Sequence, residues 1–313
     1  MIPLSLQRLR ENISSIVLGK EEAVDLLLIA LIAEGHILIE DVPGVGKTLL
    51  AKALAASLNA DYNRLQCTPD LTPTDVTGFY VLDRKSNKFV LRTGPVVTNI
   101  LLVDEINRAV PRTQASLLEA MEERQVSMDG ETIKLPRPFF VIATQNPIDH
   151  DGTFPLPEAQ LDRFLFKIAI GYPSLEEEEN ILEVHGLKNP LLELQAVASE
   201  EDVLAWQEQS NNIFVEQSIH RYIVELVRAT RNHPAVAFGA SPRASLALYR
   251  AVRAYALLKG RQFALPDDVQ YLASHVLEHR LSLKREERLK GKEPAQVVAE
   301  VLKEVPVPVE QDG

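Results

Sequence analysis

Short apolar runs alternate with helical segments along roughly the first 170 residues of the chain. Four of these runs are nearly continuous in Ile, Leu, Val and Phe, as expected for strands that are buried on both faces of a parallel sheet. Between the runs, leucines recur at helical spacing and predict helices over residues 48–58 and 112–123. The alternation predicts an α/β fold built on a parallel sheet. The predicted strands cover residues 36–40, 99–103, 139–144 and 166–170, with a weaker one at 62–67.

After about residue 172 the pattern changes to helical periodicity, and no convincing strand remains. Ser174 followed by Glu177 has the spacing of a capping box and predicts the start of a helix. Further helices are predicted over 215–231, 241–259, 266–281 and 294–303, before a tail at 304–313 that we expect to be frayed. We therefore expect an αβα core domain at residues 1–172 and an all-helical domain at residues 173–313.

Two segments of the first domain depart from the strand–helix alternation. Residues 78–92 contain two β-type runs around a polar turn. Residues 125–134 contain two alternating runs around Asp129 and Gly130, which is a strong hairpin signal. Both segments are predicted to be hairpin insertions, and whether they do more than cover an edge of the sheet stays open at this point.

Charge and composition exclude several classes of protein. The chain has 33 Lys and Arg against 44 Asp and Glu, a formal net charge of −11, which is unfavourable for general binding to nucleic-acid phosphates. Cys67 is the single cysteine, so no intramolecular disulfide can form. The apolar run at 26–33 is far shorter than the roughly 20 residues that span a bilayer. The first residues lack the pattern of a signal peptide, and we expect a cytoplasmic protein without membrane insertion.

Residues 41–48, DVPGVGKT, carry the strongest chemical signal in the sequence. They follow a predicted strand and precede a predicted helix, as a phosphate-binding loop does. Glycines let backbone N–H groups curl around a phosphate, and the helix N-terminus adds positive potential. Lys47 is expected to reach the β- and γ-phosphates and Thr48 to ligate Mg²⁺.

One position departs from the usual pattern of such a loop. Asp41 stands where a glycine normally begins the loop, and its carboxylate would weaken phosphate affinity if it faced inward. Asp tolerates unusual turn geometry better than most residues, so the loop can still close. The expected nucleotide-binding residues of this segment are Val42, Pro43, Gly44, Val45, Gly46, Lys47, Thr48 and Leu49.

Two other predicted strands end in polar side chains. The run at 100–103 is followed by Asp104 and Glu105, and the run at 139–144 leads to Asn146. Because parallel strands end at one edge of a sheet, these groups are expected beside the phosphate-binding loop. Asp104 would then hold Mg²⁺, Glu105 would act as general base towards a water, and Asn146 would orient that water or contact the γ-phosphate. On its own, Asn146 before a proline is equally an ordinary turn residue.

Two arginines are candidates for contact with a phosphate. Arg163 just precedes the fifth strand, where it could stabilise charge in a phosphoryl-transfer transition state or serve a structural role beside an Asp162 salt bridge. Arg243 lies in the first turn of a helix that Ser241 and Pro242 begin. A cation is mildly unfavourable at that end of a helix, which suggests an anionic partner.

Several phrases of the sequence resemble the MoxR family of AAA+ ATPases, which is related to the magnesium-chelatase ATPase subunit. They are GHILIEDVPGVGKT at 35–48, TPDLTPTDVTG at 68–78, DEINR at 104–108, LLEAMEE at 117–123, PLPEAQLDRF at 155–164 and GASPRA at 239–244. The resemblance covers about residues 10–285. It implies a P-loop AAA+ core with hairpin inserts and a helical lid domain, preceded by a helical insert near residues 198–209.

The resemblance also implies roles for individual residues. Lys47 and Thr48 match Walker A, and Asp104 and Glu105 match Walker B. Asn146 matches sensor 1, Arg243 matches sensor 2 acting in cis or in trans, and Arg163 matches the arginine finger that acts on a neighbouring subunit. Gly19 and Lys20 match the segment near the adenine, although the family usually has Gln in place of Lys20.

The family implies ATP and Mg²⁺ as cofactors and a homo-oligomeric ring, usually a hexamer. Its members resemble chaperones that remodel or mature protein complexes, often with a partner that has a von Willebrand factor A domain. Two other functions stay open from the sequence: a nucleotide-switched binding module with negligible turnover, and a DNA-associated AAA+ relative. The acidic charge weighs against the second. The sequence does not identify the client.

Overall fold

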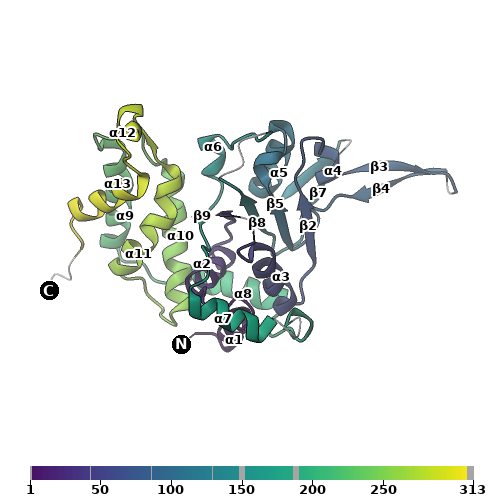
Figure 1. Ribbon diagram of the computed structural model, residues 1–313, viewed down its shortest axis with the longest axis horizontal. Helices are drawn as coiled ribbons and strands as arrows, with labels where there is room; N and C mark the ends of the chain where they lie inside the picture. Colours follow the sequence, from purple (N-terminus) through teal and green to yellow (C-terminus); the bar gives the residue numbers. More distant parts are fainter. Residues whose placement is uncertain are drawn as a thin grey trace.

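The computed structural model describes residues 2–42, 44–85, 87–128, 130–147, 152–185 and 190–308. At its centre lies a five-stranded sheet with the order β2-β5-β8-β1-β9, and all neighbouring strands are parallel (Figure 1). The predicted fold class is confirmed, and each predicted strand is present. The strands are β1 (Ile37–Glu40), β2 (Tyr62–Gln66), β5 (Ile100–Asp104), β8 (Phe140–Gln145) and β9 (Phe166–Ile168).

Successive strand residues alternate between two apolar layers, as the period of a β-strand requires. On β1, Ile37 and Ile39 belong to the larger core, which contains residues of α1 (Leu4–Ser14), α2 (Glu21–Ile32) and α3 (Lys47–Leu58). Leu38 faces the smaller core, which contains residues of α4 (Pro73–Thr77) and α5 (Pro111–Glu123). Helices therefore cover both faces of the sheet, and almost every residue of α2 is buried.

Both predicted hairpins are present. Strands β3 (Gly78–Asp83) and β4 (Lys88–Thr93) pair antiparallel and extend well beyond the rest of the molecule (Figure 1). Strands β6 (Gln125–Met128) and β7 (Glu131–Lys134) form the second hairpin directly after α5. Asp129 of the predicted turn lies outside the described residues.

The second half of the described chain is mostly helical. Ser174 and Glu177 form the predicted capping box at the start of α7 (Leu175–His185), since each side chain bonds the backbone N–H of the other. Figure 1 places α7 and α8 (Glu200–Asn211) beneath the sheet near α1, and α9 to α13 to one side of it. The remaining helices are α9 (Gln217–Asn232), α10 (Pro242–Leu258), α11 (Pro266–Leu277), α12 (Arg285–Leu289) and α13 (Pro294–Glu304).

The expectation of no strand after residue 172 is wrong. Strands β10 (Val236–Phe238) and β11 (Ser282–Leu283) form a short antiparallel pair. Segments this short show no periodicity, and their pairing is decided by the packing of the helices around them. The helix predicted to end at residue 281 stops at Leu277 and continues as η3 (Glu278–Arg280). The other short elements are η1 (Ile106–Arg108), α6 (Glu158–Leu161) and η2 (Pro190–Leu192).

Two further expectations concern the tail and the membrane. Helix α13 ends at Glu304, and residues 309–313 of the predicted frayed tail lie outside the described residues. Within the part of the chain that the structure describes, no helix has the length and apolar character needed to cross a bilayer.

His36 joins three elements at the start of β1. Its Nδ1 accepts a hydrogen bond from the backbone N–H of Val141 on β8 at 3.0 Å. Its Nε2 lies 3.2 Å from the backbone carbonyl oxygen of Met121 on α5, so Nε2 carries the proton. Burial, with a smaller effect from the Arg124 charge, lowers the pKa of His36 from 6.5 to about 4.

The low pKa of His36 predicts a loss of stability in acid. Between pH 6.5 and pH 4 the unfolded chain binds a proton at this histidine that the folded chain does not. The free energy of unfolding should therefore fall as the pH falls, by about 1.4 kcal/mol per pH unit for this one group. Urea unfolding at several pH values gives the free energy of unfolding as a function of pH. This dependence on pH should be weaker in His36→Asn than in the wild type, whereas His220→Asn, at an exposed histidine, should leave it unchanged. Equal slopes in all three proteins would contradict the prediction.

Candidate active site

The loop between β1 and α3 has the geometry of a phosphate-binding loop. Gly44 and Gly46 have φ angles of 89° and 92°, in the left-handed region that favours glycine. A Cβ atom added at either position would meet no atom within 4 Å, so both glycines face open space. Gly46 is the N-cap of α3, and the first N–H groups of that helix point into the same space. Pro43 lies outside the described residues.

Asp41 faces away from the interior of this loop. Its Oδ2 accepts hydrogen bonds from the backbone N–H groups of Ile170 at 2.8 Å and Gly171 at 2.6 Å, just after β9. Its Oδ1 accepts a bond from the N–H of Val42 at 2.8 Å. The carboxylate is buried and ties the base of the loop to the neighbouring strand. The unusual residue therefore anchors the loop through hydrogen bonds, while its charge still acts on Lys47.

Lys47 lies between the loop and the acidic end of β5. Its Nζ donates a hydrogen bond to the backbone carbonyl oxygen of Asp41 at 2.6 Å. Burial lowers the pKa of Lys47, while the negative charges of Asp41, then Asp104 and Glu105, act in the opposite direction. The two carboxylates that end β5 are thus close enough to influence the lysine, as the sequence predicted.

Asp104 and Glu105 occupy different environments. Asp104 is buried, and its Oδ2 accepts a hydrogen bond from Nε of Arg64 on β2 at 2.6 Å. Glu105 has a φ angle of 56°, which is strained for a residue with a side chain and is typical of functional sites. Its backbone N–H donates to Oγ1 of Thr144 on β8 at 3.0 Å. Its Oε2 accepts a bond from Gln66 at 3.1 Å, which orients the carboxylate.

The ends of three adjacent strands bring these groups together. In the sheet, β8 lies between β5 and β1, and Gln145 at its end is in register with Glu40 at the end of β1. Asn146 therefore follows β8 between the loop and the acidic pair, and its side chain is buried. We call this set the nucleotide edge; it comprises residues 41–49, Asp104, Glu105 and Asn146.

Gly19 and Lys20 lie against the start of α7. The Nζ of Lys20 donates to the backbone carbonyl oxygen of Tyr172 at 3.1 Å and pairs with Glu177 at 3.4 Å. Gly19 has a φ angle of 70°, and an added Cβ would lie 2.0 Å from Oε1 of Glu177. The positive φ favours glycine here, and Lys20 holds the segment to the chain just after β9.

Arg163 and Arg243 lie elsewhere, at the opposite edge of the sheet. Arg163 comes three residues before Phe166, which is in register with Ile37 at the start of β1, whereas the loop follows the end of β1. A strand of four residues separates the two edges by about 13 Å at roughly 3.3 Å per residue. Neither arginine is therefore placed to contact a nucleotide held by Lys47 of the same chain.

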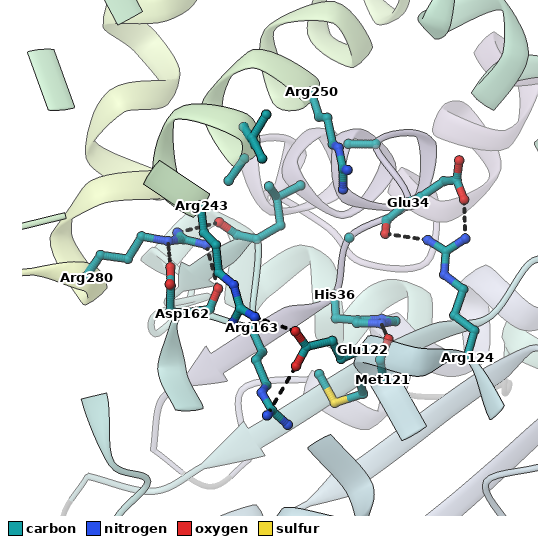
Figure 2. A pocket seen from close by; sticks show the side chains of 15 residues that line it. Glu34, His36, Met121, Glu122, Arg124, Asp162, Arg163, Arg243, Arg250 and Arg280 are labelled. Carbon is teal, nitrogen blue, oxygen red and sulfur yellow. Dashed lines mark hydrogen bonds and ion pairs between the residues drawn. The ribbon is translucent and has the colours of Figure 1, made fainter. Parts of the chain in front are cut away.

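One carboxylate joins the two arginines (Figure 2). Glu122 at the end of α5 pairs through Oε2 with Nη2 of Arg163 at 3.2 Å and through Oε1 with Nη2 of Arg243 at 2.5 Å. They line a cavity of about 330 Å³. Among the described residues, Nε of Arg163 is buried and has no hydrogen-bond partner. We call Arg163, Arg243 and Glu122 the arginine edge.

Comparison with known proteins agrees with this geometry. A model of the ATPase family associated with various cellular activities (AAA) matches residues 36–166, and a model of the AAA lid domain matches residues 228–301. The uncharacterised protein YeaC of Bacillus subtilis is 50% identical over 97% of this chain and 95% of its own length. Chaperone MoxR1 of Mycobacterium tuberculosis is 43% identical over 97% of this chain and 82% of its own length. Protein MoxR of Paracoccus denitrificans is 32% identical over 87% and 86%.

The chain belongs to the MoxR family of AAA+ ATPases. The fold of a presumed ATPase from Cytophaga hutchinsonii, known from a crystal structure, superposes on this MoxR-family chain with a TM-score of 0.92. That protein is 35% identical in sequence, and the match covers 97% of this chain and 95% of the other. The resemblance inferred from the sequence motifs is thereby confirmed, as is the combination of an AAA core with a lid.

Sequence reasoning missed several residues around the two edges of this MoxR-family protein. Glu122 lies within the family phrase LLEAMEE but gave no sign of its contacts, because both arginines are distant from it in sequence. Asp162 and Arg280 form a 2.6 Å ion pair between the core and the lid. The salt bridge of Asp162 that the sequence left open as an alternative is thus formed, and only its partner, Arg280, could not be identified from the sequence. Thr144 was read as strand, although its hydroxyl contacts the acidic end of β5.

The contacts of Asp41 predict that the usual glycine would be harmful here. Asp41→Gly removes the acceptor of three backbone N–H groups, of which that of Ile170 is buried. A hydrogen bond to a charged group contributes about 1.5–3 kcal/mol, and water can partly replace the two bonds that are only partly buried, so we expect a loss of roughly 2–4 kcal/mol in the free energy of unfolding. Urea unfolding measures it, and Asp41→Asn, which keeps one acceptor oxygen, should lose less. A glycine variant as stable as the wild type would show that the anchor is unimportant.

Proposed function

We propose that this protein is a Mg²⁺-dependent ATPase that works as a ring of identical subunits, a hexamer by family resemblance, and remodels or matures partner protein complexes. One observation carries the proposal: the loop with Lys47 lies beside Asp104 and Glu105, close enough for their charges to act on the lysine. A cationic cradle next to two carboxylates suits a nucleoside triphosphate with a bound divalent cation.

Binding is proposed to use the backbone of the loop and three side chains. The N–H groups of residues 44–48 and the Nζ of Lys47 would hold the phosphates, with the base near Gly19 and Lys20. Thr48 and Asp104 would hold Mg²⁺ together with the phosphates, and the ion would supply positive charge beside the transferring group. The donor set fits, because a hydroxyl and a carboxylate are the hard oxygen ligands that Mg²⁺ prefers. No group of three or more His, Cys, Asp or Glu that could hold a metal occurs within the described ranges, so the phosphates would complete the site.

Hydrolysis then needs one positioned water. The water oxygen attacks the γ-phosphorus, its proton passes to the Glu105 carboxylate, and the bond to the leaving ADP oxygen breaks. Gln66 donates to Oε2 of Glu105, which holds the carboxylate ready. Asn146 would orient the water from the neighbouring strand end. Positioning and charge neutralisation supply most of the acceleration in such reactions.

The two arginines would complete the site from a second subunit. Arg163 and Arg243 lie on the arginine edge, a strand length away from the loop of their own chain. Both are therefore proposed to act in trans on the γ-phosphate that the next subunit holds. Such arginines contribute about 10³–10⁵ in rate where measured. A heterologous contact of this kind generates a ring when its rotation closes.

The remodelling role draws on the relatives. A relative named as a chaperone is 43% identical to this chain, and trans-acting arginines would couple subunit movement to turnover. Client proteins, among them a partner with a von Willebrand factor A domain, follow from the family resemblance. A pull-down with a hydrolysis-deficient variant is the direct way to find them.

The general-base role predicts that binding and turnover can be separated. Glu105→Gln keeps the shape of the side chain but cannot accept the proton, so steady-state phosphate release should fall about 100-fold or more. Titration calorimetry with ATP and magnesium should give an affinity close to that of the wild type. Glu119→Gln, at an exposed position of α5, is the matched control and should hydrolyse normally. Normal turnover in Glu105→Gln would refute the role, and negligible turnover in the wild type would favour a nucleotide-switched binding module.

The trans arrangement predicts that two inactive variants restore each other. Lys47→Ala lacks nucleotide binding but keeps its arginines, whereas Arg163→Ala keeps its nucleotide edge. Each alone should lose at least about 100-fold in turnover, since the arginine is worth roughly 10³–10⁵ in related enzymes. An equal mixture should recover a measurable fraction, because some interfaces then combine two intact halves. A mixture that stays inactive would argue that Arg163 does not act between subunits.

A further inference from the structure

The two arginines of the arginine edge belong to different parts of the molecule but form one closed circuit of contacts. Their guanidinium groups meet at Glu122, as Figure 2 shows. Their backbones are connected through Asp162, the residue before Arg163, and Ser241, at the start of α10. Oδ2 of Asp162 accepts a hydrogen bond from the Ser241 hydroxyl at 3.0 Å. The same hydroxyl oxygen accepts a bond from the backbone N–H of Arg243 at 3.1 Å, which fixes the start of α10.

Asp162 is itself held by a buried arginine of the lid. Nε of Arg280, in η3, donates to Oδ1 of Asp162 at 2.6 Å, and the Arg280 side chain is only 3% exposed. The other guanidinium nitrogens donate to backbone carbonyl oxygens of the segment that carries Arg163, namely those of Asp162 at 3.1 Å, Phe164 at 2.6 Å and Leu165 at 3.2 Å. Because the guanidinium is planar and its donors are used in this way, η3 can rotate or shift little relative to the segment that carries Arg163.

The Asp162 carboxylate therefore links η3 to the start of α10 beside Arg163. One oxygen faces η3 and the other faces the first turn of α10, while the peptide bond continues directly to Arg163. We propose that Asp162 is a positioning residue that holds Arg163 of the core and Arg243 of the lid as a single unit. The proposal rests on the trans action of both arginines argued above. It adds that the lid cannot shift relative to the core without moving the two charges together.

The circuit has a consequence for catalysis. Two guanidinium groups that approach the same γ-phosphate must keep a set distance, and a misplacement of about 1 Å can cost 100-fold in rate. Glu122 is partly exposed and can release its arginines to a phosphate, because surface ion pairs are weak. Asp162 and Arg280 are more buried and remain when the phosphate arrives. Loss of Asp162 should thus reduce turnover, while the nucleotide edge of the same subunit, across the sheet, stays intact.

The test is Asp162→Asn, with three readouts. We expect kcat to fall about tenfold or more, since a small misplacement has effects of this size. The KM for ATP and the affinity for ATP with magnesium should stay within about twofold of the wild type, because the variant's own nucleotide edge is unchanged. A mixture of Asp162→Asn with Lys47→Ala should recover activity, as the mixture of Arg163→Ala with Lys47→Ala does. A mixture of Asp162→Asn with Arg163→Ala should not recover activity, because both variants are defective at the arginine edge.

Asp268→Asn is the matched control, since Asp268 also forms a buried, two-bonded pair with an arginine of the lid, Arg261, away from the arginine edge. It should keep wild-type kcat below its unfolding temperature. If Asp162→Asn does not fold, Ser241→Ala carries the test: it breaks the bond to α10, leaves Asp162 on Arg280, and should lower kcat by a smaller factor with the same recovery.

The outcomes are distinguishable. Suppose that Arg163→Ala and Lys47→Ala restore each other's activity. If Asp162→Asn, or Ser241→Ala in its place, then has the same kcat as the Asp268→Asn control, the positioning role is overturned and the proposed function stands. A variant whose lost activity does not recover with Lys47→Ala also overturns it, because the defect would then lie beyond the arginine edge. Failure of the Arg163→Ala and Lys47→Ala pair overturns the trans arrangement and this role together.

Discussion

The common direction of the five strands is the constraint on which the rest of this molecule depends. Parallel strands collect their carboxyl ends at one edge, and there the loop with Lys47 meets Asp104, Glu105 and Asn146. The segment before β9 must then lie at the other edge, so Arg163 is directed away from the nucleotide edge of its own chain. In the function proposed above, a single subunit would carry both halves of a phosphoryl-transfer site without bringing them together. Assembly is therefore built into the proposed chemistry.

Carboxylates organise both edges by accepting hydrogen bonds. Asp41 holds the base of the loop to the chain after β9, and Asp162 holds the core to the lid. Glu122 gathers two guanidinium groups that would otherwise repel each other. In a chain of net charge −11, a few acids placed in this way keep a local group of arginines in a defined arrangement. The acidic composition and the arginine edge are thus compatible, because net charge is summed over the whole chain whereas the arginine edge concerns a few neighbouring side chains.

The lid contacts the core at the segment that carries the arginine edge. Arg280 of η3 contacts the segment before β9. The chain continues from β9 to α7, whose Glu177 lies against Gly19. In the proposed mechanism, a movement of the lid would act on the arginine edge through these contacts. A remodelling ATPase needs such a link, since turnover at one interface has to change the relation between subunits.

The sequence by itself determined the five parallel strands, the helices α3, α5, α9, α10 and α13 and the loop at residues 41–48, because these depend on local periodicity and on the spacing of Gly, Lys and Thr. It also determined that Asp104 and Glu105 end a buried strand, and hence that they approach Lys47. The short β10–β11 pair, the outward turn of Asp41 and the contacts of Glu122 and Asp162 were decided only by the tertiary structure. Each of these contacts joins residues far apart along the chain. The orientation of a carboxylate depends on the N–H groups or arginines that lie within about 3 Å of it in the folded structure. A periodic pattern contains no information on such partners.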